Sequence, residues 1–308
     1  MADRHRIGVV GARGHTGSEL LGILDRHPGV EVVHAGSREL AGQSVPQIDG
    51  LVFENLGPQE LADLSLDGVF LALPDGHSGQ FVDATSANTA IVDISSDHRF
   101  DDNWVYGLPE LFRNKISGAR RIANPGCYAT VIQLAIAPFK DDLGGVPAVF
   151  GVSGYSGSGT TASPKNDPDR LRDNLMPYKL VGHNHEREAT RYIEHPVRFM
   201  PHVHPAFRGL LVTAHIPLAT PTTRDSAADK FRVRYATEPL IEIQEDAPEL
   251  RDGTGLTGAV FGGIEVSNDG HNIVVVGAED NLLKGAAVQA VQNLNLALGH
   301  PEMTGIFK

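Results

Sequence analysis

The sequence predicts an α/β protein in two parts: a parallel sheet with crossover helices, and then an α+β part with a mixed or antiparallel sheet. Three observations support this. Strand-like and helix-like segments alternate through the first 125 residues, and the periodicity changes after Cys127. A length of 308 residues, with 41% hydrophobic and 21% charged residues, suits a globular chain of about two domains.

The first part contains four short apolar runs rich in Val and Ile, with an amphipathic helix expected over Ser18–His27. Because these runs lack polar alternation, we expect strands buried on both faces, as in a parallel sheet covered by helices. The expected strands are Arg6–Val10, Val30–Ala35, Gly68–Leu73 and Ala90–Ile94.

Longer strands separated by loops are expected after Cys127, in the manner of an antiparallel sheet: Ala148–Ser153, Val197–Met200, Leu210–Pro217 and Asn272–Val276. Ser153–Pro168, rich in Gly, Ser, Thr and Pro, is expected to be a loop. Asn281–Leu298 has helical spacing, and Gly299 is placed as its C-cap. We expect this helix to return to the first domain, so the predicted domains are 1–126 plus 281–308, and 127–280.

The composition limits the classes of function. A formal net charge of −12 argues against nonspecific binding of nucleic acid, and no apolar run approaches the ~20 residues of a membrane span. Residues 7–10 are too short an apolar run for a secretory signal. A single cysteine excludes an intrachain disulfide framework and fits a reducing compartment.

A glycine-rich loop, Gly8–Gly17, follows the first expected strand and opens the first expected helix. Glycines in that context allow a tight turn and bring backbone N–H groups close to a pyrophosphate at the helix N-terminus. The loop predicts a Rossmann-type dinucleotide site, and the alternative is a purely structural turn.

The second expected strand leads to Ser37 and Arg38, with no carboxylate at its tip. An acidic residue there would bind the ribose 2′-hydroxyl of NAD. A hydroxyl and a guanidinium suit a 2′-phosphate instead, which favours NADP. The alternative for Arg38 is a solvated surface charge.

Cys127 lies in a turn, Asn124-Pro125-Gly126-Cys127, followed by a helical pattern. A thiol in the first turn of a helix is near unpaired N–H groups and the positive end of the helix dipole, which favour the thiolate. This predicts a nucleophile, and the alternative is a buried packing residue.

His183 and His185 belong to the densest polar cluster, Gly182–Glu188. A metal site is disfavoured, because residues i and i+2 of a helix do not face the same way and no third ligand is evident. One of the two is predicted to be an acid/base partner of the thiolate, and the alternative is a surface or packing histidine.

Two arginines are candidate anion clamps. Arg99 follows an expected strand at its carboxyl end, where open α/β sheets place their ligands, and Arg208 follows a His- and Pro-rich turn. For Arg99 the alternative is a structural ion pair.

Taken together, these residues resemble the N-acetyl-gamma-glutamyl-phosphate reductase family over nearly the full length. The motifs that carry the resemblance are Gly8–Gly17, Ser37–Gly42, Ala72–Pro74, Asp93–Phe100, Tyr106–Leu111, Asn124–Thr130, Gly151–Thr160, His183–Glu188 and Asp280–Gly285. Thr160 stands where more divergent members carry an arginine, so that arginine's role is not transferred.

The resemblance implies a glyceraldehyde-phosphate-dehydrogenase-like second domain, a homotetramer or dimer, and NADP(H) as cofactor. Cys127 would be the nucleophile and His183 the acid/base, with His185 the second choice. The implied cofactor-binding residues are Gly8, Gly11, Arg13, Gly14, His15, Thr16, Gly17, Ser37, Arg38, Pro74, Ser95 and Asn281. The implied substrate-binding residues are Arg99, Asn124, Ser156, His185 and Arg208.

The reaction implied is NADPH-dependent reduction of an N-acetylglutamyl phosphate to the semialdehyde through a thioester on Cys127, a step of arginine biosynthesis. No metal, nucleic acid or membrane is expected. The cytoplasm is the expected location, with a mitochondrial matrix as the alternative. Rival interpretations are a reductase of aspartyl phosphate or a carrier-linked aminoadipyl phosphate, a nonenzymatic dinucleotide sensor, and a cysteine hydrolase.

Overall fold

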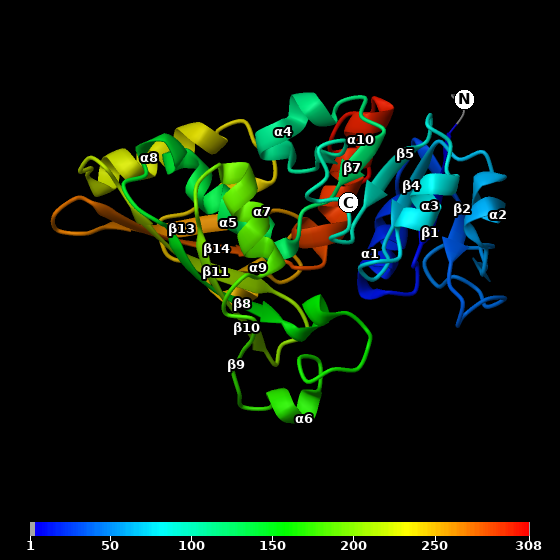
Figure 1. Ribbon diagram of the computed structural model, residues 1–308, viewed down its shortest axis with the longest axis horizontal. Coiled ribbons are helices and arrows are strands. Elements are labelled where there is room, and N and C mark those ends of the chain that lie inside the picture. Colours follow the sequence, from blue (N-terminus) through cyan, green and yellow to red (C-terminus); the bar gives the residue numbers. More distant parts are fainter. Residues whose placement is uncertain (1–3, 308) are drawn as a thin grey trace. The chain divides into compact units, whose positions relative to one another are not determined.

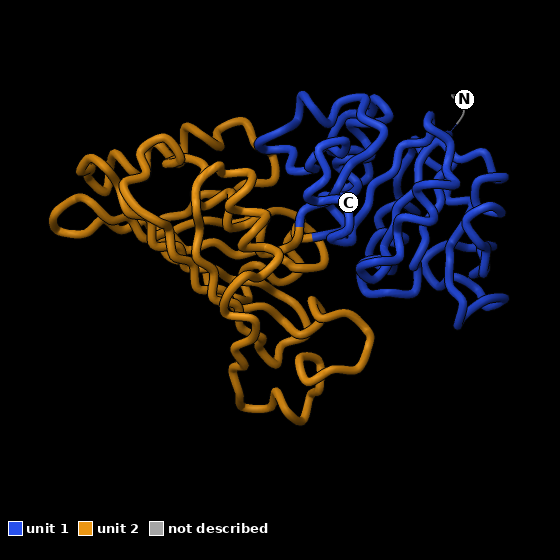
Figure 2. The backbone as a smooth tube through the Cα atoms, viewed as in Figure 1, with its two compact units in different colours: residues 1–125, 286–308 blue, residues 126–285 orange. Residues whose placement is uncertain are grey.

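The computed structural model describes residues 4–307, and the terminal residues of the predicted first domain, 1–3 and 308, lie outside this range. The chain divides into two compact units (Figure 2). Unit 1 comprises residues 1–125 and 286–308, and unit 2 comprises residues 126–285.

The core of unit 1 is a seven-stranded sheet in which every pair of neighbours is parallel. Its strands are β1 (His5–Val10), β2 (Val30–Gly36), β3 (Phe53–Glu54), β4 (Gly68–Leu71), β5 (Ala90–Asp93), β6 (Val105–Tyr106) and β7 (Arg121–Ala123). They lie in the order β3-β2-β1-β4-β5-β7-β6. The order reverses between β1 and β4, so the carboxyl ends of these two strands mark the position where such sheets bind ligands.

Helices cover both faces of this sheet. They are α1 (His15–Leu24), α2 (Pro58–Ala62), α3 (Gly79–Ala84), α4 (Pro109–Ile116) and α10 (Val288–Leu298). Helix α10 contacts α1, β4 and β5, while α2 and α3 contact each other (Figure 1). Because helices lie on both sides, β4 and β5 are buried along their whole length, as predicted.

Unit 2 is built on a second seven-stranded sheet. Its strands are β8 (Ala148–Gly154), β9 (Met176–Pro177), β10 (Arg198–His204), β11 (Leu210–Pro217), β12 (Ile241–Ile243), β13 (Ala259–Val266) and β14 (Asn272–Glu279). The order is β12-β13-β14-β11-β8-β10-β9. The pairs β8/β10 and β12/β13 are parallel and the others antiparallel, so the sheet is mixed rather than purely antiparallel.

One face of this sheet carries the main helices of unit 2 (Figure 1). The helical segments are α5 (Cys127–Ile136), η1 (Ala137–Asp142), η2 (Tyr155–Ser158), α6 (Pro168–Leu171), α7 (Asn184–Ile193), α8 (Arg224–Tyr235) and α9 (Leu250–Gly253). Helix α5 packs against β11 and β14, and α7 packs against α5 and β10. Every residue of α5 after Cys127 is buried, so Cys127 begins a helix that is anchored in the core.

Several predicted ends were wrong. Helix α1 begins at His15 and ends at Leu24, three residues earlier at each end than predicted, and β4 stops at Leu71. Strand β14 runs on to Glu279, and β10 continues through Pro201 to His204. Proline is tolerated there because β10 is bordered on its outer side only by the two residues of β9.

The predicted C-terminal helix divides into two parts. A π-helical segment, Leu283–Ala287, precedes α10, and π segments of this kind interrupt helices at specific sites. Gly299 is the left-handed C-cap, with a φ of 78°, as predicted. Helix α10 belongs to unit 1, where it packs on β4 and β5.

Candidate active site

The glycine loop of unit 1 leaves no room for side chains at two positions. A Cβ on Gly11 would lie 2.2 Å from the carbonyl oxygen of Ala72, and its φ of +84° also disfavours other residues. A Cβ on Gly17 would lie 2.4 Å from the carbonyl oxygen of Gly11. The loop therefore follows a tight path at the carboxyl ends of β1 and β4, which only glycine permits.

The N-terminus of α1 opens directly from this loop. Gly14 is the N-cap, no side chain caps the helix, and the first turn contains no acidic residue. The first N–H groups of a helix have no partner within the helix and carry partial positive charge. Together with the glycine cradle, this end of α1 fits the pyrophosphate of a dinucleotide.

The polypeptide after β2 presents the residues predicted to select the cofactor. The amide of Ser37 donates to the carbonyl of Glu54 at 2.8 Å, and its hydroxyl accepts from the amide of Leu40 at 3.1 Å. Arg38 is exposed, whereas Arg13 of the glycine loop forms a 3.0 Å ion pair with Glu39. The structure thus places two guanidinium side chains near the tip of β2, of which one already has a carboxylate partner.

A buried hydrogen-bond network follows β5. The Ser95 hydroxyl lies 2.9 Å from both carboxylate oxygens of Asp93, and His98 Nδ1 lies 2.7 Å from Asp93 Oδ2. The hydrogen bond to this carboxylate raises the pKa of His98, because it favours the imidazolium. Ser78 joins the network through Asp93 and Asp97. Ser95 is therefore held by the protein itself, while Pro74 lies exposed after β4.

Arg99 and Asn124 support the turn that leads to Cys127. Arg99 is buried; its Nε donates to the carbonyl of Asn124 at 2.9 Å and its Nη2 to the carbonyl of Ile94 at 2.8 Å. The Asn124 side chain accepts from Asn293 at 2.9 Å and donates to the carbonyl of Ala286 at 3.3 Å. Both side chains thus donate hydrogen bonds to backbone carbonyls near the turn. The sequence had suggested a structural role as an alternative for Arg99 only.

Cys127 is the first residue of α5, as predicted, and it is partly exposed. The preceding Gly126 amide donates to the buried carboxylate of Glu188 at 3.0 Å, which ties the turn to α7. The carbonyl of Gly126 accepts from the amide of Thr130 at 2.9 Å. These bonds fix the start of α5, where the first backbone N–H groups of a helix have no partner within the helix.

His183 is the N-cap of α7 and is buried. Its Nδ1 accepts the amide hydrogen of His185 at 3.1 Å. Burial is the main cause that lowers its pKa to about 3, with smaller contributions from His185 and Lys179. The ring is therefore neutral at pH 7, and because Nδ1 is an acceptor, its proton lies on Nε2.

The rings of His183 and His185 are in contact, with centroids 4.7 Å apart. The helical spacing that counted against a shared face does not apply to this pair, because His183 precedes α7 in an extended conformation, with φ −62° and ψ 143°. Within residues 4–307, no cluster of three or more His, Cys, Asp or Glu is arranged to hold a metal ion.

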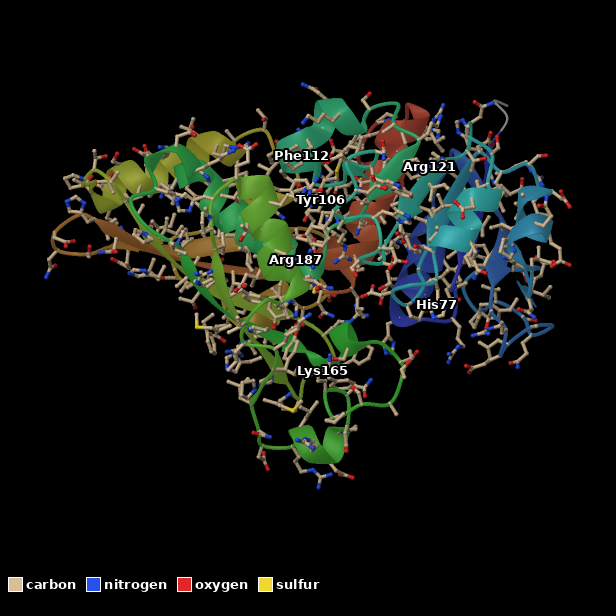
Figure 3. All side chains as sticks on the ribbon, in the orientation of Figure 1. His77, Tyr106, Phe112, Arg121, Lys165 and Arg187 are labelled. Carbon is tan, nitrogen blue, oxygen red and sulfur yellow. The ribbon has the colours of Figure 1, made fainter. Side chains whose placement is uncertain are left out.

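Tyr178 and Lys165 complete the surroundings of His183. The Tyr178 ring packs against His183 at 5.5 Å, and Lys165 Nζ lies 5.0 Å from the Tyr178 ring. Figure 3 shows Lys165 on the loop-rich part of unit 2 that also holds α6. Burial, and next the charge of Cys127, raise the pKa of Tyr178 well above its ordinary value. Tyr178 therefore lies against the buried ring at the N-cap of α7.

Asn281, Ser156 and Arg208 belong to three segments of unit 2 that hydrogen bonds and an ion pair hold together. Asn281 Nδ2 donates to the Ser156 hydroxyl at 2.9 Å, and its Oδ1 accepts from the amide of Gly209 at 3.0 Å. Arg208 Nη1 lies 3.4 Å from Asp280 Oδ2 and remains partly exposed. The amide of Asn281 is thus engaged at both ends, whereas Arg208 keeps a solvent-accessible portion.

Sequence reasoning missed Glu188, Glu279 and Tyr178. Glu279 could have been found, because it ends a Val-rich strand that is expected to be buried. Acidic side chains are rarely fully buried unless they have a specific role or partner. Glu188 gave a weaker signal, since its burial depends on how α7 packs.

Two family models match consecutive parts of the chain: "Semialdehyde dehydrogenase, NAD binding domain" over residues 6–119, and "Semialdehyde dehydrogenase, dimerisation domain" over residues 127–281. A solved aspartate semialdehyde dehydrogenase II from Vibrio cholerae has the same fold, with a TM-score of 0.81 at 19% identity over 97% of this chain and 99% of that one. A second, from Candida albicans and described with NADP, has a TM-score of 0.73 at 18% identity over 99% of this chain and all of that one. The class is thus a semialdehyde dehydrogenase, an oxidoreductase with a nicotinamide cofactor.

Sequence relatives narrow the class. The N-acetyl-gamma-glutamyl-phosphate reductase of Xanthomonas oryzae pv. oryzae is 51% identical over 97% of this chain and 98% of that protein. That of Stenotrophomonas maltophilia is 50% identical over 97% of each chain. The chain belongs to the N-acetyl-gamma-glutamyl-phosphate reductase family.

None of the helices within residues 4–307 combines the length and apolar character needed to cross a membrane.

Proposed function

We propose that the chain catalyses the NADPH-dependent reduction of N-acetyl-gamma-glutamyl phosphate to N-acetylglutamate 5-semialdehyde, with release of phosphate. The observation that carries the proposal is the position of the only cysteine: Cys127 begins a core-anchored helix in a chain 51% identical to a reductase of that name. The product would serve arginine biosynthesis.

In this reaction the Cys127 sulfur attacks the carbonyl carbon of the acyl phosphate, an S–C bond forms, and the C–O bond to phosphate breaks. Phosphate leaves with the electron pair, and a thioester remains on Cys127. The hydride that reduces the thioester carbon would come from NADPH when this cofactor is bound. The C–S bond then breaks, and the semialdehyde leaves.

Backbone N–H groups at the start of α5 would stabilise the oxyanion that forms at the acyl carbon. His183 would help as a hydrogen-bond donor, because its neutral ring keeps a proton on Nε2. We propose that this proton is directed to the substrate oxygen, with His185 as the second choice.

NADP is the proposed cofactor rather than NAD. The glycine cradle and the open N-terminus of α1 fit a dinucleotide and involve Gly8, Gly11, Gly14, His15, Thr16 and Gly17. Ser37 and Arg38 would bind the 2′-phosphate, with Arg13 available once its pair with Glu39 opens. For Pro74 we propose a packing role against the cofactor. For Ser95 and Asn281, whose side chains bond within the protein, we propose an indirect role.

Substrate binding is assigned mainly to Arg208 and His185. Arg208 is partly exposed, so its guanidinium fits a carboxylate or phosphate. Arg99, Asn124 and Ser156 make hydrogen bonds within the protein, so we propose that they act chiefly by shaping the site.

A homo-oligomer, dimer or tetramer, is the proposed assembly. On the sheet of unit 2, the face opposite the helices is partly exposed and rich in apolar residues, among them Phe150, which is 37% exposed. The family model for this part is described as a dimerisation domain, which suits such a face. We also propose that the enzyme works in the cytoplasm, because the relatives named above are bacterial.

Steady-state oxidation of N-acetylglutamate semialdehyde, with phosphate and either NADP or NAD, tests the proposal. We expect phosphate-dependent formation of NADPH and much slower reaction with NAD. Preference for aspartate semialdehyde would point to a sister reductase. The absence of any turnover, with a thiol inert to iodoacetamide, would favour a dinucleotide sensor.

A further inference from the structure

Cys127 has a buried carboxylate as a neighbour. Glu279 is the last residue of β14 and is fully buried. The surroundings of Gly285 limit the distance between Glu279 and Cys127. A Cβ built on Gly285 would lie 2.6 Å from Cys127 Cβ and 2.8 Å from Glu279 Oε1. Cys127 Cβ and Glu279 Oε1 are therefore separated by no more than the sum of these two distances, and Gly285 lies against both.

The packing of α5 on β14 explains this proximity. A Cβ on Gly277 would lie 2.9 Å from Val131 Cγ2, so this part of β14 faces α5. Glu279 is two residues further along the strand and points to the same face, while Cys127 is four residues before Val131 on the same side of the helix. Strand and helix thus bring Glu279 and Cys127 together at one end.

The thiol needs an acceptor for its proton when it attacks. His183 is poorly suited, because its Nδ1 already accepts the His185 amide and its Nε2 carries the ring proton. The Glu279 carboxylate has oxygens that can accept a proton, and it lies in the same buried part of unit 2 as the start of α5.

We infer that Glu279 and Cys127 share one proton, with the Glu279 carboxylate taking it from the thiol during attack and returning it later. In the first step the S–H bond breaks and an O–H bond forms on Glu279, while the sulfur pair forms the S–C bond. When the C–S bond breaks, the sulfur regains its electron pair and takes the proton back. This inference rests on the proposed role of Cys127 as nucleophile.

Other charged groups belong to the same part of unit 2. Glu188 accepts from the Gly126 amide, and Asp280 accepts from the amides of Gly255 and Leu282 at 2.7 and 2.9 Å. Arg208 lies beside Asp280. Three further titratable groups belong to the surroundings: Tyr128 follows Cys127 on α5, Tyr178 packs against the ring of His183, and Lys284 is buried next to Gly285.

Alkylation of Cys127 by iodoacetamide tests the shared proton without substrate or cofactor. Cys127 is the only cysteine, so the label reports one site. Two coupled acids lose their protons in two steps. We therefore expect the wild-type rate to rise with pH in two steps separated by a plateau, and to rise in one step in Glu279→Gln. The matched control is Glu238→Gln, a buried carboxylate elsewhere in unit 2, which should keep two steps.

Turnover supplies the second readout. We expect Glu279→Gln to lower kcat about 100-fold while the KM for NADPH stays unchanged, and Glu279→Asp to retain more activity. A single-step wild-type profile overturns the inference, even if Glu279→Gln fails to fold. Two steps without turnover of N-acetylglutamate semialdehyde would instead refute the proposed substrate and leave the shared proton standing.

Discussion

The glycine loop of unit 1 and the surroundings of Cys127 in unit 2 are built on opposite plans. The loop is one continuous segment, Gly8–Gly17, whose shape depends on glycines that pack against nearby backbone. The surroundings of Cys127 combine α5, the N-cap of α7 and the end of β14, which are far apart in the chain. One bulky substitution can distort a site formed by a single continuous segment. A site assembled from distant segments depends instead on how whole helices and strands pack.

If the two regions work independently, damage to one should spare the other. Cys127→Ser should lower turnover at least about 1000-fold, because a hydroxyl is far less ionised than a thiol. NADPH affinity, measured by fluorescence titration, should stay within about twofold of wild type. Retained turnover would refute the thioester mechanism, and lost NADPH binding would refute the independence of the regions.

Gly11→Ala makes the reverse test. Its Cβ would lie 2.2 Å from the Ala72 carbonyl, so we expect the loop to distort and NADPH affinity to fall about 100-fold or more. Alkylation of Cys127 should proceed at the wild-type rate. Gly22→Ala is the control: the position is within α1 with nothing within 4 Å, and alanine should stabilise by about 0.5–1 kcal/mol. Normal NADPH binding by Gly11→Ala would contradict the proposal that the glycine loop Gly8–Gly17 binds the cofactor.

The buried neutral His183 makes a pH-dependent contribution to the stability of unit 2. Its pKa is about 3 in the folded state against an ordinary 6.5, so the unfolded state binds a proton first as pH falls. The free energy of unfolding therefore carries no penalty from His183 above about pH 6.5. Between that pH and about pH 3 it falls by a few kcal/mol.

Urea unfolding of wild type and His183→Gln across that range measures this slope. The wild type should lose more stability toward acid than His183→Gln does, whereas His195→Gln, at a partly exposed histidine, should follow the wild type. Identical slopes in all three proteins would show that His183 is not held neutral.

Arg38→Ala should have the smallest effect on the overall reaction, because it removes only the proposed contact between one guanidinium and the 2′-phosphate of NADP. We expect the KM for NADP to rise about 10- to 100-fold with kcat for NAD unchanged, since a charge-assisted hydrogen bond is worth about 1.5–3 kcal/mol. Arg170→Ala, on exposed α6 of unit 2, is the control. An equal loss with NAD and NADP would show that Arg38 does not contact the 2′-phosphate.

Elements with strong local signals were predicted well. The buried strands β4 and β5, the start of α5 at Cys127 and the C-cap at Gly299 all follow from residue order, because periodicity and glycine conformation act over a few residues. The ends of α1, β10 and β14 were not, since neighbouring strands and helices decide where a segment stops.

By itself, the sequence determined the parallel sheet, the glycine loop and the position of the lone thiol at a helix start. Only the tertiary structure decided that His183 is buried at the N-cap of α7, that Asn281 and Arg99 make hydrogen bonds within the protein, and that Glu279 lies near Cys127. Burial and proton location depend on which elements pack together, and residues distant in the chain become neighbours only through that packing.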